Sequence, residues 1–241
     1  MKIACWSGPR NLSTAMMYAF AARGDCAVWD EPFYAAYLAA TGLEHPLAAE
    51  TIAAGLTDPD AVARACSETE PAEKPHFYQK QMAHHMLPDF PLGWAAKLTN
   101  IILIRHPVRV VASYAVKRES PEAEDLGAAR LREIHDFLHS SGQTPTILDS
   151  ADIRADPGAV LEALCDRVGL PWTAKMLTWQ AGGRSEDGPW AAHWYGAVHA
   201  STGFAGPEGS LPVLDGRLAD IAASMMEDYE ALADLRLRPG A

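Results

Sequence analysis

Arginine and hydroxyl side chains follow a short apolar run near the start of the chain, where they could bind an anion. Residues 3–6 are apolar, residues 7–9 (Ser-Gly-Pro) end the run, and Arg10 precedes an Ala- and Met-rich segment that opens with Ser13 and Thr14. The pattern predicts a strand, a loop and a helix. Free N–H groups at a helix start, together with a guanidinium, make a phosphate site.

A second arginine has the same placement. Residues 100–104 are the most strand-like run of the sequence; Arg105 follows them, Pro107 opens a helix, and Ser113 lies on that helix. Ligands of open α/β sheets bind beyond the carboxyl ends of the strands. We therefore expect the two anion sites to meet at one edge of the sheet.

Two carboxylates are placed at the same edge. Asp30 and Glu31 follow an apolar run at residues 26–29 and precede Pro32. Glu31 is our candidate general base, and we expect nearby cations to keep it ionised and to lower its basicity. The alternative is that Asp30 or Glu31 caps a helix over 33–40, with Pro32 at its first position.

The loop after the first strand departs from the pattern of triphosphate-binding proteins. The Walker motif G-x-x-x-x-G-K-[ST] needs a second glycine and a lysine before a hydroxyl residue. Gly8 is followed by Pro-Arg-Asn-Leu-Ser-Thr, which has neither. This disfavours a Mg-dependent nucleoside triphosphatase.

Both arginine elements resemble those of sulfotransferases. The Pro-Arg-x-x-Ser-Thr stretch at 9–14 is similar to that family's 5′-phosphosulfate loop, with Asn11 and Leu12 in place of the usual Ser-Gly. Arg105, the following proline and Ser113 resemble its 3′-phosphate element. The resemblance covers roughly the first half of the chain and continues more loosely to its end. It is closer to bacterial members than to animal cytosolic enzymes.

The resemblance implies transfer of a sulfuryl group from 3′-phosphoadenosine-5′-phosphosulfate (PAPS) to a hydroxyl or amine of a small-molecule or carbohydrate acceptor, without a metal. It places Glu31, Lys80 and Arg10 in catalysis. Lys80 matches the lysine that meets the transferring group, whereas Met82 stands where the family has a histidine base. The matching donor-binding residues are Gly8, Pro9, Arg10, Asn11, Leu12, Ser13, Thr14, Arg105 and Ser113.

Residues 179–214 are dense in Gly, Pro, Trp, His and Tyr. Long irregular segments in compact domains are usually functional or disordered, and disordered segments lack aromatic residues. We therefore expect an ordered lid. The candidates for acceptor binding are Glu31, His84, His193, Trp194 and Tyr195, with simple packing as the alternative for the histidines and aromatics. The adjacent His84 and His85 invite a zinc site, but spacing reveals no third ligand.

The remaining pattern alternates strands and helices. It predicts strands over 76–80 and 144–148, and helices over 91–98, 122–140, 156–169 and 215–233. Residues 45–72 are predicted to be a helical region, with a helix start at 57–61. Together these predict one domain over 1–241. Its fold is a three-layer α/β/α sandwich with a mostly parallel sheet of about five strands, and the resemblance implies a P-loop nucleotide hydrolase-like fold.

Composition excludes some classes of function. The chain has 241 residues and a net charge of −11, which disfavours a long nucleic-acid contact. No apolar stretch is long enough for a membrane span or a signal peptide. Four scattered cysteines indicate reduced thiols in a cytoplasmic protein. A homodimer stays compatible with the sequence. Two rivals stay open, namely a P-loop-type small-molecule kinase and a non-catalytic nucleotide-binding protein of the same fold.

Overall fold

Five parallel strands form the central sheet of the protein. The computed structural model describes residues 1–71, 73–116 and 121–240. The strands are β1 (Lys2–Ser7), β2 (Cys26–Asp30), β3 (His76–Met82), β4 (Thr99–Ile104) and β5 (Thr146–Asp149), in the order β2-β3-β1-β4-β5. The predicted parallel sheet is confirmed, and β1, β2 and β3 each run further than the sequence pattern indicated.

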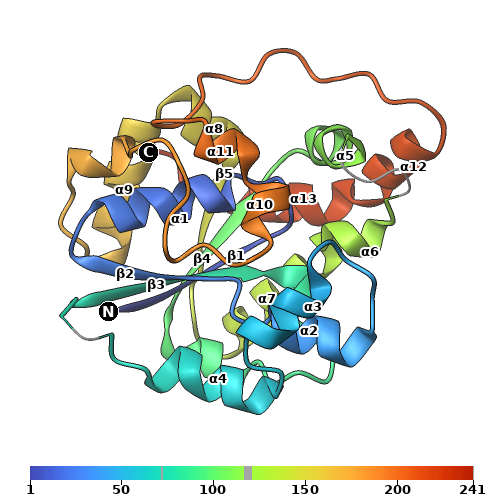
Figure 1. Cartoon of the computed structure of the whole chain (residues 1–241). Coiled ribbons are helices and arrows are strands. Elements are labelled where there is room, and N and C mark those ends of the chain that lie inside the picture. The colour runs from blue at the N-terminus through green and yellow to red at the C-terminus, as the bar shows by residue number, and fades with distance from the viewer. Residues whose placement is uncertain (72, 117–120, 241) are drawn as a thin grey trace.

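Alternating side chains of the strands divide the core into two layers. Ile3 and Cys5 of β1 face one cluster, and Ala4 and Trp6 face the other. The first cluster is covered by α1 (Ser13–Ala22), α8 (Ser150–Ala155) and α9 (Pro157–Val168), and the second by α4 (Pro59–Glu68), α7 (Ala128–Ser140) and α13 (Met226–Ala233). Figure 1 shows α1 and α9 on one side of the sheet and α4 on the other. The predicted three-layer architecture is confirmed.

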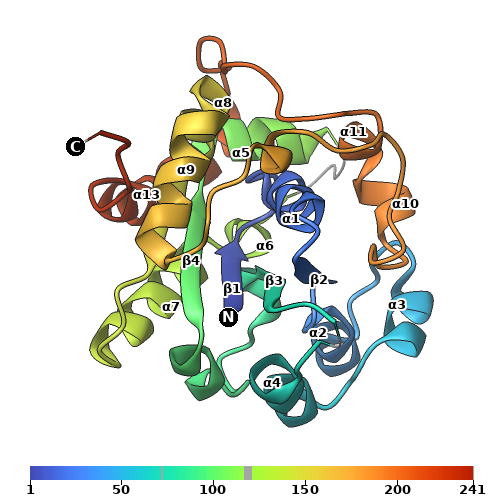
Figure 2. The ribbon, with the colours of Figure 1, turned by 90° about the vertical axis from the view of Figure 1, so that its left-hand side faces the viewer.

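The other elements surround the ends of the sheet. They are α2 (Tyr34–Thr41), α3 (Ala48–Ala54), α5 (Pro107–Ala115), α6 (Ala123–Leu126), α10 (Ala191–Trp194), α11 (Gly196–His199), α12 (Gly216–Ser224) and the short 3-10 helices η1 (Ala83–His85), η2 (Gly93–Lys97) and η3 (Ala174–Leu177). Figure 2 shows α5 beyond the carboxyl end of β1. No helix in the described ranges combines the length and the apolar character that crossing a membrane requires.

Several predicted helices need correction. The helix expected over 122–140 is divided into α6 and α7 at Gly127, whose φ of 66° breaks the helical path. A side chain there would also press on the backbone N of His84, 3.2 Å from an added Cβ. The helix expected over 215–233 is divided at Met225.

Two further predicted helical stretches have a different form. The stretch expected over 91–98 is the 3-10 helix η2 (Gly93–Lys97), and the adjacent His84 and His85 lie in the 3-10 turn η1. The region over 45–72 holds α3 and α4, with the predicted helix start confirmed by Asp58 as N-cap. Its last residue, Ala72, lies outside the described residues.

The strand order decides where loops gather. Strand β1 lies between β3 and β4, so the loops that follow these three strands emerge side by side. In an open α/β sheet, neighbouring strands whose connections run to opposite faces of the sheet leave a crevice between their loops at the carboxyl edge. The predicted site residues at this edge lie on these loops, on the loop after β2, in β3 itself (Lys80) and on helices that border the loops, such as α1 (Ser13, Thr14) and α5 (Ser113).

Candidate functional site

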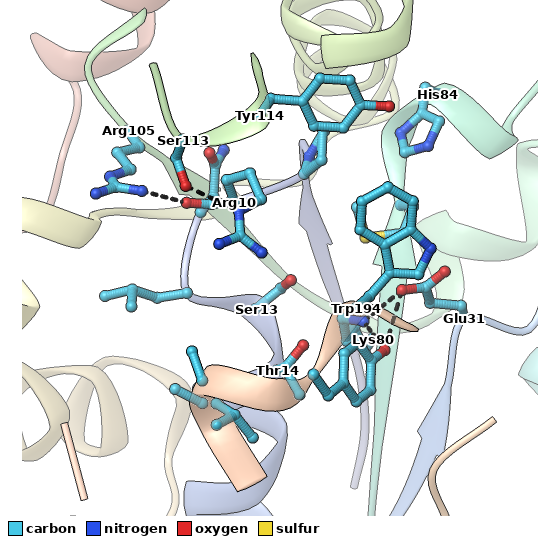
Figure 3. Close-up of a pocket in the computed structure, with 18 of the residues that line it drawn as sticks. Arg10, Ser13, Thr14, Glu31, Lys80, His84, Arg105, Ser113, Tyr114 and Trp194 are labelled. Atoms are coloured by element: carbon cyan, nitrogen blue, oxygen red, sulfur yellow. Dashed lines mark hydrogen bonds and ion pairs between the residues drawn. The ribbon is translucent and has the colours of Figure 1, made fainter. Parts of the chain in front are cut away.

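A cavity with a volume of about 330 Å³ opens at this edge. Its walls come from the loops after the strands, from α5 and from the α10–α11 region. Among the residues expected from sequence, those that line it are Pro9, Arg10, Asn11, Leu12, Ser13, Thr14, Glu31, Lys80, His84, Arg105, Ser113, Trp194 and Tyr195. In Figure 3 the arginines and Ser113 lie at one end, Glu31 and Lys80 at the other, with Ser13 and Thr14 between.

The arginine end joins the two predicted anion sites into one. The Arg10 Nε donates to Ser113 Oγ at 2.9 Å, and the Arg105 Nη1 donates to the backbone oxygen of Arg10 at 2.7 Å. Burial, followed by repulsion from Arg105, lowers the pKa of Arg10. Crowded guanidiniums in a cavity favour an anionic ligand, because such a ligand relieves their repulsion.

The backbone around the cavity adopts sparsely populated conformations. Arg10, Leu12 and Glu31 have positive φ values of 64°, 66° and 43°. Non-glycine residues rarely occupy this region, and each instance costs about 1–3 kcal/mol that the surrounding structure must offset. The packing around the cavity therefore holds the loops after β1 and β2 in these conformations.

The other end of the cavity contains a buried ionic cluster around Lys80. The Lys80 Nζ lies 3.0 Å from Asp30 Oδ1, 2.5 Å from Glu31 Oε1 and 2.5 Å from the hydroxyl of Tyr195. An ammonium has three N–H donors, so all are used. The Tyr195 oxygen also accepts from Trp190 Nε1 at 3.0 Å and lies 2.8 Å from Asp30 Oδ2. Trp190 and Tyr195, on either side of α10, therefore complete a cluster whose other members come from the end of β2 and from β3.

Two carboxylates share one ammonium in this cluster. Burial raises the pKa of Glu31; Lys80 opposes this shift and the neighbouring Asp30 adds to it. The expected net lowering of the Glu31 pKa is therefore wrong: Lys80 does lower it, but burial outweighs the cation. For Lys80, burial favours the neutral form, but Asp30 and Glu31 outweigh it and raise the pKa. Burial holds the pKa of Tyr195 well above its ordinary value, so it stays a neutral phenol.

Neither carboxylate caps α2. The N-cap position of this helix is Phe33, with no side-chain capping bond. Glu31 contributes only its backbone oxygen, which accepts from the Tyr34 N–H at 3.0 Å, while its side chain lies in the cavity wall. The capping alternative is therefore wrong.

Aromatic and imidazole rings form the wall next to Glu31. They belong to Tyr34, His45, His84, His85, Tyr114 and Trp194. The His85 ring stacks on Tyr34 at 4.2 Å, and burial holds the pKa of His85 well below its usual value. His85 Nδ1 is 3.8 Å from Glu31 Oε2, which is too far for a hydrogen bond. A neutral imidazole there supplies shape and polarity without charge.

Two residues expected in the site do not line the cavity. His193 lies outside it, with its ring against Trp194 at 4.6 Å, which corrects its expected placement in the acceptor wall. Gly8 faces α6 instead, where an added Cβ would lie 2.5 Å from the backbone oxygen of Leu126. The absence of a side chain at Gly8 thus allows the loop and α6 to approach closely.

The sequence analysis missed several residues of the site. Tyr34, His45, Tyr114 and Arg154 line the cavity. Asp30, which the sequence placed at this edge, lies directly behind the cavity wall, but its ion pair with Lys80 was not predicted. The others lie on helices or loops whose position depends on tertiary packing, so no local signal marked them.

A family model described as a sulfotransferase domain matches residues 1–235. The chain belongs to this family. Two proteins of Arabidopsis thaliana, named Branched-chain-amino-acid aminotransferase-like protein 2 and 1, are 37% and 36% identical to it over 206 and 203 residues. These matches cover 86% and 84% of this chain but 36% of each relative, so the chain spans about a third of their length.

Solved sulfotransferase structures share the fold. The sulfotransferase from Alicyclobacillus acidocaldarius matches with a TM-score of 0.58 and 11% identity, over 98% of this chain and 96% of that one. The sulfotransferase domain of a Synechococcus olefin synthase matches with a TM-score of 0.57 and 18% identity, over 95% and 94%. In the described part of this sulfotransferase domain, no three His, Cys, Asp or Glu side chains gather in a way that could hold a metal ion.

Proposed function

We propose that this sulfotransferase domain transfers a sulfuryl group from PAPS to a hydroxyl or amine of a small-molecule or carbohydrate acceptor. The observation that carries the proposal is the division of one cavity into two ends. One end offers Arg10, Arg105 and Ser113 to phosphate oxygens, and the other offers the Glu31 carboxylate. An anionic donor and a nucleophile that must lose a proton need these two chemistries in one cavity.

The arginine end suits the donor. Its 5′-phosphosulfate would bind the loop at residues 9–14, all of which line the cavity, and its 3′-phosphate would bind Arg105 and Ser113. Charge that develops on the oxygen between phosphorus and sulfur would be stabilised by Arg10 and the loop. Placing both reactants in one cavity supplies the alignment that group transfer requires.

Glu31 is the proposed general base. It takes the acceptor's proton as the acceptor oxygen or nitrogen bonds to sulfur and the bond from sulfur to the bridging oxygen breaks, leaving adenosine-3′,5′-bisphosphate. A raised pKa suits this role, because a stronger base accepts the proton more readily. Once Glu31 is protonated, Lys80 no longer needs to neutralise it. One Lys80 N–H is then available to the leaving oxygen, while Asp30 remains its counter-ion.

The rivals have less support. A P-loop-type kinase would use a Walker lysine, which the loop sequence lacks. A non-catalytic nucleotide-binding protein would not need a buried carboxylate beside the donor site, and Glu31 lies in the cavity wall. The four buried free cysteines fit the reducing conditions of the cytoplasm, where we expect the protein to act.

Titration calorimetry with adenosine-3′,5′-bisphosphate and with 5′-AMP tests the donor assignment. We expect the bisphosphate to bind more tightly, because only it can reach Arg105 and Ser113 with a 3′-phosphate. A charge-assisted contact contributes about 1.5–3 kcal/mol, so Arg105→Ala should weaken bisphosphate binding at least tenfold. It should weaken 5′-AMP binding less, because Arg105 only supports the 5′-phosphate loop through the Arg10 oxygen. Equal affinities for the two nucleotides would refute the assignment. Mass-spectrometric detection of sulfated products from a panel of acceptors tests the transfer itself.

A further inference from the structure

A carboxylate of this chain already binds the arginines beside the donor end of the cavity. Glu208 Oε1 accepts from Arg105 at 3.0 Å (Nε) and 2.5 Å (Nη2), and from Arg154 Nη1 at 3.0 Å. Its other oxygen lies 2.8 Å from Arg109 Nε. The Glu208 side chain is only 3% exposed. Three guanidiniums from the end of β4, from α5 and from α8 thus surround one carboxylate.

Glu208 lies on a segment without regular secondary structure, residues 205–215, which we call the strap. Figure 1 shows the strap as a long loop that passes over α5 between α11 and α12. Its backbone is held by the same arginines, since Gly206 oxygen accepts from Arg154 Nε at 2.8 Å and Gly209 oxygen accepts from Arg109. Most of its residues are exposed, including Val213 at 95%. Little apolar burial therefore opposes its release.

The chemistry of this arginine cluster favours a stronger anion than a carboxylate. Glu208 supplies one negative charge against three positive charges, whereas a phosphate monoester carries close to two and offers three oxygens to guanidinium forks. Arg105 and Arg154 both line the cavity, so the cluster is continuous with it. With Glu208 in place, the Nε, Nη1 and Nη2 of Arg105 all have partners, Glu208 and the Arg10 oxygen. These bonds use three of the five N–H donors of Arg105, and Glu208 takes the Nε and Nη2 pair that would bind a phosphate as a fork.

We propose that Glu208 occupies the 3′-phosphate subsite in the free protein and that the donor's 3′-phosphate displaces it, binding Arg105, Arg109 and Arg154 in its place. This rests on the proposed function, and it adds two arginines and an internal competitor to the donor site. Binding then requires the strap to leave the arginines. The measured affinity is the intrinsic affinity reduced by the fraction of molecules in which the strap is released.

The test compares Glu208→Gln with the wild-type protein by titration calorimetry. Glutamine keeps the size of the side chain but loses the charge that competes with phosphate. The probes are adenosine-3′,5′-bisphosphate, 5′-AMP and inorganic phosphate. We expect the variant to bind the bisphosphate at least fivefold more tightly, to bind inorganic phosphate more tightly as well, and to bind 5′-AMP unchanged. Asp215→Asn is the matched control, because Asp215 is an exposed carboxylate at the last position of the strap, makes no side-chain capping bond and, among the described residues, is not one of the contacts of the three arginines.

A loss of bisphosphate affinity in Glu208→Gln would overturn the proposal. If Glu208→Gln binds the bisphosphate less tightly, Glu208 orders the arginines for the ligand and does not compete with it. If neither protein binds the bisphosphate but the variant gains affinity for inorganic phosphate, the competition stands and the proposed function fails. If Glu208→Gln gains as much affinity for 5′-AMP as for the bisphosphate, Glu208 does not compete with the 3′-phosphate and the proposal is refuted.

A second measurement does not depend on changing Glu208. The four native cysteines are buried, so an exposed Ser210→Cys can be labelled selectively with a nitroxide. We expect the spin label to become more mobile when adenosine-3′,5′-bisphosphate is added and to stay unchanged with 5′-AMP. A label that becomes less mobile with the bisphosphate would show that the strap closes on the ligand, and the displacement would be refuted.

Discussion

Replacing Glu31 with glutamine separates its role in the chemistry from its role in the buried cluster. Glutamine retains an oxygen that can accept from Lys80, which still has Asp30 as its counter-ion. We therefore expect affinity for adenosine-3′,5′-bisphosphate to stay within a few-fold of wild type. Turnover with a true acceptor should fall by roughly 10²–10⁴, the contribution of a general base. Calorimetry and steady-state kinetics on the same preparation measure both quantities.

The same variant should change how the free energy of unfolding depends on pH. Because burial raises the pKa of Glu31, the folded protein binds this proton more tightly than the unfolded chain does. This contribution is complete below the unfolded pKa and is lost as the pH rises through the folded pKa. Glutamine has no proton to lose. Stability should therefore shift in favour of Glu31→Gln as the pH rises, by about 1.4 kcal/mol for each tenfold difference in proton affinity.

Asp30→Asn is the matched control, since it removes the other carboxylate that shares Lys80. Glu31 would then have the ammonium to itself, and its pKa should fall. The acidic limb of the pH–rate profile should move to lower pH, with a smaller loss of turnover than in Glu31→Gln. The reasoning fails if Glu31→Gln keeps near wild-type turnover while His84→Ala abolishes it. It also fails if the unfolding free energies of Glu31→Gln and wild type run parallel from pH 4 to 8 in urea titrations.

Three further outcomes follow from the structure. Lys80→Met should destabilise the fold by about 3–5 kcal/mol in urea titrations at pH 7, because two buried carboxylates lose their cation; a loss under 1 kcal/mol would contradict a buried ion pair. Gly8→Ala should cost about 1–3 kcal/mol in the same assay, because its Cβ would meet backbone of α6 that must shift. EDTA should leave bisphosphate affinity unchanged in calorimetry, since arginines supply the positive charge; abolished binding would favour a metal-dependent kinase.

Local patterns were sufficient for the sheet and for the arginine end of the site. Every strand except β3 contains an apolar run, and both Arg10 and Arg105 stand where such a run gives way to a helix start. Parallel strands bring their carboxyl ends together, so the meeting of these two arginines also followed from the order of the elements. The break of the helix at Gly127 was not predicted, because the apolar spacing continues across the glycine and only its positive φ interrupts the helix.

The parts of the site that could not be predicted from the sequence depend on contacts between distant segments. Tyr195 reaches Asp30 across 165 positions, and Glu208 reaches Arg105 across 103. The rise in the Glu31 pKa comes first from burial and then from Asp30, which shares Lys80, and neither the burial nor the shared lysine shows in the local sequence. Glu208 looked like one of many charges in an exposed loop. Its burial becomes visible only when three arginines from separate elements converge on it.

The uneven charge of the cluster around Lys80 has a consequence for which acceptors can react. Asp30 and Glu31 bring two carboxylates to a single ammonium, so this end of the cavity has no positive charge to spare while the arginine end has an excess. An acceptor that carries its own carboxylate or phosphate would be repelled beside Glu31 and drawn toward the donor's place. A neutral or cationic alcohol or amine meets no such penalty. We therefore expect the cavity to select acceptors by charge, and a panel of acceptors that differ only in charge should show this as a trend in kcat/KM.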